Sequence, residues 1–548
     1  MDSASHLFTL HRDAVLDPTA FAELPEVALS TAGKQALAAF RAILAEHPPE
    51  QVEKRGRVPK TVLRSLGRDG LFGLTIPAEY GGLALPFSEY LRVVAEMAKS
   101  DLSLAMACLA HLSIGLQGIV LFGTPEQKQR LLPTAAQGRT IFAYALTEPG
   151  TGSDAQHIET RARLAEDGTH YVLDGQKTYI TNANYADAFT VFAQLEGNEG
   201  MVALVVERAS EGLTVGPDMP KMGLKASSTA FLRFDGVRVP VANRLGAPGE
   251  GFRVAMAILN YGRLAVCAAG VGLMEQSLAD MVKRATQRQQ FGAAISTFEL
   301  IQEKLAAARV DGFVAGSMVD FAARQLERDP TANVAMETSH CKLFATTRAW
   351  HTLYEAMQVA GGSGYLASNP YEKRMRDYRV ATIFEGTSEI HSIYPAGFLL
   401  REFAGALPRG GDVVRVRALL GSALRRQRWA DGGGGSAERR ARRTARRCVG
   451  AARRLGHLAL AVHGKELGHR EFVLRRLTWL STYAYGLLAA EARVRALVRE
   501  RGPAGAVEER ELLEAFCDVA RSALWELWRP WNSAREKRVG RIAARLQG

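Results

Sequence analysis

The spacing of apolar residues changes twice along this chain of 548 residues, and the changes separate parts that must fold differently. Up to about residue 140, apolar residues recur at helical spacing, as at Tyr90, Val93 and Met97. From Phe142 short apolar segments typical of strands follow, and beyond Gly251 the helical spacing returns. One hydrophobic core rarely supports so long a chain. We therefore predict four domains, at residues 1–141, 142–250, 251–400 and 401–548.

Several short strands at this spacing predict that the central part is a small barrel or sandwich. The dipeptide Asp174-Gly175 is a tight-turn signal, which we expect to end the first strand. The predicted strands are residues 170–173, 188–194, 202–206 and 230–234. In the third part we predict helices over residues 254–289 and 297–325, with a break at Asp329-Pro330.

The net charge of +12 is concentrated in the last part of the chain. Residues 401–548 hold 31 Lys and Arg against 15 Asp and Glu, whereas the first 400 residues hold 38 against 42. Gly432 to Gly435 is typical of a flexible linker, and an arginine-dense helical segment follows it. Its arginines are Arg439, Arg440, Arg442, Arg443, Arg446 and Arg447. A basic tail on a weakly acidic body favours an anionic partner for the tail.

Three roles fit this basic tail. Basic residues and Trp on an amphipathic helix suit an anionic membrane surface. Nucleic acid is the other anionic partner, but no recognition motif accompanies the charge, so we expect no binding to nucleic acid. The third role is a helical domain packed on the body, with solvated arginines. The expected apolar stripe of the helix is Cys448, Ala452, Leu455, Ala459 and Val462, and five of the six Trp lie beyond residue 400, at Trp429, Trp479, Trp525, Trp528 and Trp531.

Other patterns exclude several classes of protein. No uninterrupted run of 18 apolar residues occurs, so a membrane-spanning helix is not expected. Residues 1–11 lack a basic region followed by an apolar core, which argues against a secretory signal. The five cysteines are dispersed, which indicates reduced thiols and a cytoplasmic location, peripheral at the inner membrane surface if the tail binds there. The histidines lie at no metal-ligand spacing, so we expect no metal site.

Two segments around the central strands carry groups suited to an aromatic cofactor, although the chain has no GxGxxG dinucleotide fingerprint. In residues 144–154, Pro and Gly give a fixed loop, and Thr147 and Ser153 offer hydroxyls. In residues 175–182, Tyr179 and Thr181 share one strand face, so that one can stack on a ring while the other bonds to it. Taken alone, the second segment is equally typical of an ordinary half-buried strand.

Two further segments complete the set. Arg288, in residues 288–292, suits a pyrophosphate because its planar fork holds phosphate oxygens bidentately. The glycine pair at 361–362 lets the backbone approach a dinucleotide closely. Glu385 lies between Phe and Gly in an apolar neighbourhood, where burial would raise its pKa and suit it to remove a proton α to a thioester. Taken singly, a solvated Arg, a loop and an acidic helix N-terminus explain these residues equally well.

Together and in this order, the four segments resemble the acyl-CoA dehydrogenase family over roughly residues 60–400. Further matches lie at residues 221–230 and 258–263. Three features resemble the very-long-chain branch most: residues 258–263, residues 111–115 and the large extension past residue 400. The resemblance implies a mainly α fold with an N-terminal helical domain, a central β-barrel and a C-terminal helical bundle, here followed by a helical extension.

The resemblance also implies FAD, held in part across the subunit interface of a homodimer, and Glu385 as the catalytic base. It implies substrate contacts at Ser153, Arg263 and Gly386. Some members carry the base just before the residue equivalent to Arg263, where this chain has Gly262, which cannot act as a base. The implied cofactor contacts are Tyr144, Leu146, Thr147, Ser153, Tyr179, Thr181, Arg288, Phe291, Gln358, Gly361, Gly362, Thr387 and Glu389.

The reaction that the resemblance implies is the α,β-dehydrogenation of a long-chain fatty acyl-CoA to the trans-2-enoyl-CoA, with electrons passed to an electron-transferring flavoprotein. One alternative is an acyl-CoA oxidase, which passes the electrons to oxygen. The other is a flavoprotein assembly or scaffold factor with residual dehydrogenase activity. Small residues at Ala107 and Ala110 favour a deep acyl pocket, but only weakly, since alanine is also the commonest helix former.

Overall fold

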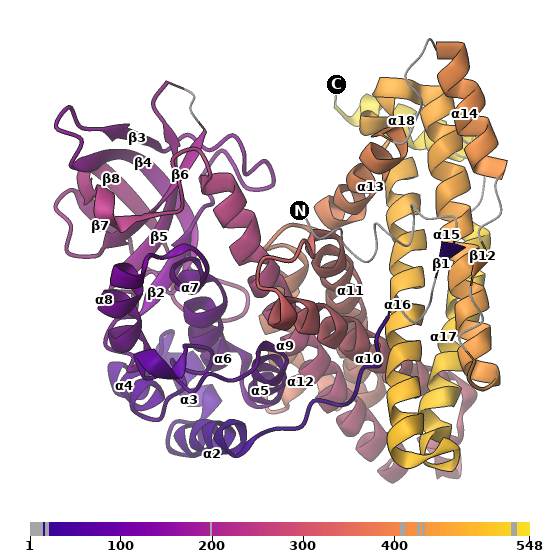
Figure 1. Cartoon of the computed structure of the whole chain (residues 1–548). Helices are drawn as coiled ribbons and strands as arrows, with labels where there is room; N and C mark the ends of the chain where they lie inside the picture. The colour runs from indigo at the N-terminus through magenta and orange to yellow at the C-terminus, as the bar shows by residue number, and fades with distance from the viewer. Residues whose placement is uncertain are drawn as a thin grey trace.

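The structure is a computed structural model that describes residues 15–16, 21–197, 200–405, 412–424, 428–429, 433–527 and 534–547. Figure 1 shows the sheet at one end of the molecule, the extension helices at the other, and the helices α9 to α12 between them. This is the mainly helical fold with a central β domain that the sequence predicts. A parallel pair of short strands, β1 (Val15–Leu16) and β12 (Arg428–Trp429), joins the start of the chain to the extension.

The N-terminal part is helical, as its apolar spacing predicts. The helix α8 begins at Pro125, where Thr124 and Gln127 form a capping box and Pro125 is the first helical residue. A π-helical segment, η3 (Ala110–Gly115), continues α6 and faces the sheet. The helices are α2 (Thr31–Glu46), α3 (Pro49–Arg55), α4 (Lys60–Arg68), α5 (Phe87–Ser100), α6 (Leu102–Leu109), α7 (Gln117–Phe122) and α8 (Pro125–Ala136).

The central strands form one mixed eight-stranded sheet in the order β7-β8-β4-β3-β5-β6-β9, with β2 paired to β5. The predicted turn at Asp174-Gly175 is wrong, because β4 runs through it with a register shift between Leu173 and Gly175. A Cβ on Gly175 would lie 2.7 Å from Thr160 Cα, so the glycine serves a close approach of backbone and not a turn. The strands are β2 (Phe142–Ala145), β3 (Arg161–Leu164), β4 (His170–Thr181), β5 (Ala188–Leu195), β6 (Met201–Glu207), β7 (Leu213–Val215), β8 (Thr229–Pro240) and β9 (Arg244–Leu245).

The chain then returns to helices, and the predicted break at Asp329-Pro330 is confirmed between α10 and α11. Two segments, residues 102–122 and 251–287, are long and apolar enough to cross a membrane, but in each the apolar window is 83% buried inside the protein, as expected of core helices. The helices are α9 (Gly251–Gln287), α10 (Glu299–Arg328), α11 (Ala335–Ala360), α12 (Pro370–Tyr378) and α13 (Ser388–Gly405).

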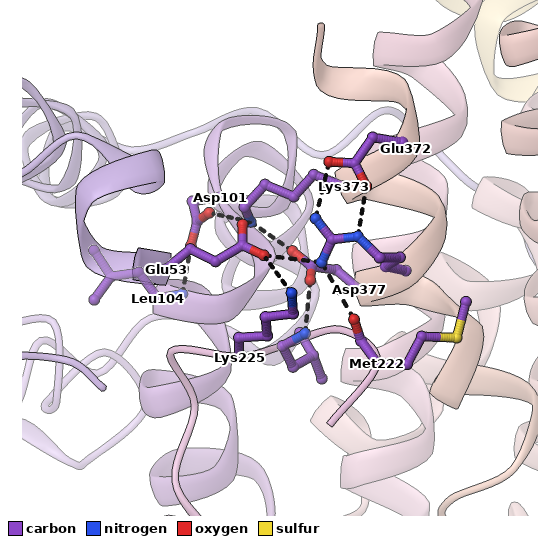
Figure 2. Close-up of polar contacts among 10 residues, drawn as sticks. Glu53, Asp101, Leu104, Met222, Lys225, Glu372, Lys373 and Asp377 are labelled. Carbon is purple, nitrogen blue, oxygen red and sulfur yellow. Dashed lines mark hydrogen bonds and ion pairs between the residues drawn. The ribbon is translucent and has the colours of Figure 1, made fainter. Parts of the chain in front are cut away.

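A cluster of charged side chains on α12 links three parts of the molecule (Figure 2). The Lys373 ammonium lies 2.8 Å from Asp101 Oδ2, at the start of α6, and 2.6 Å from Asp377 Oδ2. The Asp377 carboxylate also accepts a hydrogen bond of 2.6 Å from the backbone N–H of Leu224, in the β domain. The helix α12 leads into the loop that carries Glu385. By joining α12 to α6, this cluster fixes the helix from which that loop starts.

The extension packs on the body as a helical domain, the third of the roles considered for it. The Tyr485 hydroxyl donates to the backbone oxygen of Met318 (2.7 Å), and the Thr482 hydroxyl lies 2.7 Å from His340 Nδ1. All four residues are fully buried, so these contacts lie in the interior between α16 and the body. The helices are α14 (Asp412–Leu424), α15 (Ser436–His463), α16 (Glu471–Arg501), α17 (Val507–Leu527) and α18 (Ala534–Leu546).

The basic face predicted on α15 is wrong in part. Arg442 is 6% exposed and forms a buried ion pair of 2.5 Å with Glu491 of α16, and Arg440 pairs with Asp518 at 2.5 Å. Charge spacing along one helix cannot reveal acidic partners that lie on another helix. The exposed arginines are Arg439, Arg443, Arg446 and Arg447.

The predicted apolar stripe of α15 is also mostly internal, because four of its members lie in the protein core: Cys448, Ala452, Leu455 and Ala459. Val462 is exposed. Trp479 is half-buried and Trp525 is exposed. The side chain of Trp429, and the residues Gly432, Trp528 and Trp531, lie outside the described residues.

Candidate active site

A cavity of about 400 Å³ lies where η3, the end of β4, α9 and the loop before α13 meet. Its walls include apolar side chains of both helical parts, among them Leu109, Ala110, Ile114 and Met256. Ala107, the other small residue considered for the acyl pocket, does not line it. The cavity brings together nine of the residues that the sequence singled out: Tyr144, Leu146, Thr147, Ser153, Tyr179, Thr181, Arg263, Glu385 and Gly386.

A buried ion pair holds the loop after β2 in place. Lys177 is fully buried, and its ammonium donates to Glu148 Oε1 (2.6 Å) and to the backbone oxygen of Leu146 (3.0 Å). The Glu148 carboxylate also accepts a hydrogen bond from the backbone N–H of Thr160 (2.9 Å). Removing one partner of a buried ion pair leaves the other charge buried and uncompensated, which is strongly destabilising. The pair therefore fixes the loop to β4. Sequence reasoning missed both residues, although a Lys inside an apolar strand is a signal.

Tyr179 and Thr181 both line the cavity, and Ile180 between them lines it too. Ile180 between them is buried, whereas Tyr179 is 68% exposed. The strand is irregular here, with a register shift between Lys177 and Ile180, and Tyr179 has a φ of +57°. A tyrosine in this left-handed region is strained, and such strain is concentrated at ligand sites. The ring is thus presented at the rim of the cavity.

Glu385 lies in the loop between α12 and α13 with a φ of +56°. Its Oε2 atom is buried and has no hydrogen-bond partner among the described residues. A Cβ added to Gly262 would lie 2.5 Å from this oxygen, so the carboxylate occupies the space that a side chain on α9 would fill. The two positions at which family members carry the base therefore converge on one place in the cavity.

The electrostatics of the cavity favour a base that works near neutral pH. Burial raises the pKa of Glu385 to about 7, and the positive charges of Arg263 and Lys342 oppose this rise. Arg263 also donates from Nε to the backbone oxygen of Glu385 (3.4 Å). Desolvation therefore dominates the pKa of this carboxyl, which is the environment expected of a general base.

The remaining predicted cofactor residues do not line this cavity. Thr387 caps α13 by accepting a hydrogen bond from the Ile390 N–H (3.3 Å), and Glu389 is exposed in the first turn. The other five lie at the far ends of α9 and α11, which are adjacent because Met281 and Ala285 pack on Ala356 and Val359. All five are exposed: Arg288, Phe291, Gln358, Gly361 and Gly362.

No group of three or more His, Cys, Asp or Glu able to hold a metal ion occurs in the described part of the chain. The residues present fit a flavin instead. Thr147, Tyr179 and Thr181 line the cavity from β4 and the loop after β2, and Glu385 lines it from the loop before α13. Polar groups for a ring edge, an aromatic ring that can stack and a buried base in one cavity suit a flavin and its substrate.

Comparison with known proteins agrees with this geometry. The acyl-CoA dehydrogenase N-terminal, middle and C-terminal domain models match residues 31–139, 143–237 and 249–394. The very long-chain specific acyl-CoA dehydrogenase, mitochondrial, of Bos taurus is 36% identical over 499 residues, which cover 86% of this chain and 75% of that protein.

Two solved structures are similar over most or all of their length. The acyl-CoA dehydrogenase of Bacillus anthracis complexed with FAD has a TM-score of 0.82 at 29% identity, covering 95% of this chain and 91% of that chain. A chain in the structure of the electron transferring flavoprotein of Acidaminococcus fermentans has a TM-score of 0.63 at 33% identity, covering 69% and 100%. With three domain models in order and these relatives, the chain belongs to the acyl-CoA dehydrogenase family, resembles its very-long-chain members and is an FAD-dependent dehydrogenase.

Proposed function

We propose that this enzyme converts long-chain fatty acyl-CoA to trans-2-enoyl-CoA in fatty acid β-oxidation, with Glu385 as the base that removes the α-proton. The observation that carries the proposal is the Glu385 carboxylate itself, which lies in a largely apolar cavity with one oxygen unpaired and a pKa of about 7. Such a carboxylate is ionised near neutral pH and basic enough to accept a proton. Bound FAD supplies the acceptor for the β-hydride.

The chain's own residues position the substrate in this proposal. Ser153 and Gly386 line the same cavity as the base, and we assign them to contact with the thioester end of the substrate. Tyr179 lines the cavity with its ring exposed, so the ring would stack on a bound flavin and limit access of water. The apolar wall around Leu109 and Ile114 suits the acyl chain. Thr147 and Thr181 are placed to bond to the edge of the flavin.

We further propose an electron-transferring flavoprotein as the acceptor, because of the likeness to a chain in the structure of the electron transferring flavoprotein of Acidaminococcus fermentans. The experiment is a series of saturated acyl-CoAs of increasing length, assayed with that flavoprotein and separately with oxygen alone. We expect kcat/KM to be highest for long chains and no peroxide with oxygen alone. Turnover with oxygen that matches turnover with the flavoprotein would favour the oxidase. An FAD-loaded protein without turnover would favour the assembly factor.

We propose that the protein is a homodimer in which each FAD contacts both subunits. Arg288, Gln358 and the glycine pair lie outside the cavity of their own chain, so they are available to a cofactor bound by the partner. Large exposed apolar side chains accompany them, with Phe291 96%, Leu300 73% and Tyr365 82% exposed. Exposed apolar groups gathered at one end of a helical bundle are typical of an interface.

We propose that the enzyme is cytoplasmic and that α18 associates peripherally with the anionic inner membrane surface. This helix has no buried residue, and Val539, Ile542 and Leu546 give it an exposed apolar row. It carries five basic residues, and its one acidic residue, Glu536, pairs with Arg476. Trp525, near the end of α17, is 76% exposed. Basic and apolar groups together suit an anionic lipid surface.

A full-length variant with Val539→Glu and Ile542→Glu is expected to lose salt-sensitive binding to anionic liposomes, because each Glu opposes both apolar contact and surface charge. Turnover of short, soluble acyl-CoA should stay unchanged. The matched control, Val414→Glu with Leu420→Glu, places the same charges on exposed positions of α14 and should still bind. Wild-type protein that ignores such liposomes at low ionic strength would exclude the membrane role.

A further inference from the structure

The backbone that carries Glu385 has an unusual conformation. Glu385 and Gly386 have φ of +56° and +94°, so two successive residues lie in the left-handed region. For a residue with a side chain this conformation is unfavourable, and it persists only where the surroundings hold it. Both residues precede α13, so helix hydrogen bonds do not reach their carbonyl oxygens. The loop therefore depends on side chains for support.

Three buried side chains bind these two carbonyl oxygens, and the first is Arg263, whose Nε donates to that of Glu385 (3.4 Å). Lys342 Nζ donates to the backbone oxygen of Gly386 (3.1 Å). His391 Nε2 lies 3.0 Å from the backbone oxygen of Glu385, and its Nδ1 lies 2.6 Å from the Ser339 hydroxyl. Burial lowers the pKa of His391 well below its usual value, so the ring is neutral. A carbonyl oxygen can only accept, so the contact with His391 assigns the proton to Nε2 and makes the Ser339 hydroxyl the donor to Nδ1.

Lys342 acts on the base without facing the substrate. Its side chain is fully buried on α11 and does not line the cavity, whereas that of Arg263 does. Its positive charge favours the ionised form of Glu385, against the effect of burial. The titratable groups that interact with Glu385 are Arg263 and Cys267 on α9, Lys342 on α11, Tyr144 on β2 and Tyr90 on α5, with the His391 ring bound to its carbonyl.

We propose that Lys342 is a positioning residue for the catalytic base. Its ammonium fixes the Gly386 carbonyl oxygen and supplies a positive charge that keeps Glu385 ionised. His391, held by Ser339, fixes the carbonyl oxygen of Glu385. The two contacts together hold the left-handed turn that directs the Glu385 side chain into the cavity. This inference rests on the proposed role of Glu385.

The test is the pH profile of kcat/KM for FAD-loaded, full-length Lys342→Met. Without the positive charge, Glu385 becomes protonated at a higher pH, so the acidic limb should move up by about one pH unit. The pH-independent kcat should fall about tenfold because the base is less well placed. The matched control is Arg442→Met, which removes a buried positive charge from α15, outside the cavity. It should lower thermal stability but leave the acidic limb where it is in the wild type.

An acidic limb that does not move in Lys342→Met would overturn the inference. The His391 contact gives a second test if that variant does not fold. His391→Leu suits a buried site but has no donor, whereas Gln keeps an N–H at similar reach. We expect His391→Leu to lower kcat about tenfold and His391→Gln to recover most of the loss. If Leu is tolerated better than Gln, His391 is only a core residue. Retained turnover in Glu385→Gln would instead overturn the proposed function.

Discussion

Replacing Glu385 by Gln is expected to lower turnover about 10³-fold while the fold and the bound FAD are kept. The amide has the size of the carboxyl group but cannot accept the α-proton. The single-turnover rate of flavin reduction by acyl-CoA measures this step directly. Activity within about tenfold of the wild type, a change in barrier of only about 1.4 kcal/mol, would contradict the assignment. The matched control is Glu166→Gln, an exposed residue in the turn between β3 and β4, which should keep wild-type activity.

The pH dependence of the wild-type enzyme belongs to the same prediction. Glu385 must be ionised to act as a base, and its pKa is raised to about 7 by burial. The rate should therefore fall as the pH falls below about 7, and it should be nearly constant above it until another group titrates. A glutamate with its ordinary pKa would remain active well below this pH, so the position of the acidic limb reports the burial of Glu385.

Replacing Arg288 by Ala is expected to release FAD and to lower the thermal stability of the dimer in the same variant. Hydrogen bonds to a charged group contribute about 1.5 to 3 kcal/mol each, so losing a bidentate pair should weaken flavin binding 10²-fold or more, an estimate of about 3 kcal/mol. If the cofactor contacts both subunits, its release removes contacts between them, so loss of flavin and loss of dimer stability should occur together. Flavin absorbance after gel filtration and sedimentation velocity measure the two effects.

The control for Arg288 is Lys283→Ala, which removes an exposed positive charge from the same helix one turn earlier. This variant should keep its flavin. The Lys283 ammonium lacks the planar guanidinium, so it makes no bidentate contact with the phosphates that its removal could break. A wild-type protein that is monomeric and saturated with flavin would rule out the shared site. Loss of flavin in both variants would show that Arg288 contributes only general charge.

The four motif segments illustrate how far the sequence reached. Fold class and cofactor were predictable because the motifs are local strings, whose residues stay together whatever the tertiary arrangement. Glu385 and Gly262 were predictable as a pair because a base can be at only one of the two positions, and the structure shows the Glu385 carboxylate over the bare backbone of Gly262. Tyr179 and Thr181 line one cavity together with Ile180, because the strand is irregular at this point and three successive residues reach the same space.

Only the tertiary structure decided which groups meet across long stretches of chain. Gly175 signals a turn, yet contact with Thr160 makes it part of a continuous strand. Arg442 has the spacing of a solvated charge, yet it is buried in an ion pair with Glu491, 49 residues away. Lys342 reaches Gly386 from 44 residues away. The sequence by itself determined the family and the flavin motifs and singled out the candidate base, because local order encodes them. Burial and ion pairing depend on partners that local order does not contain, so the fold decided them.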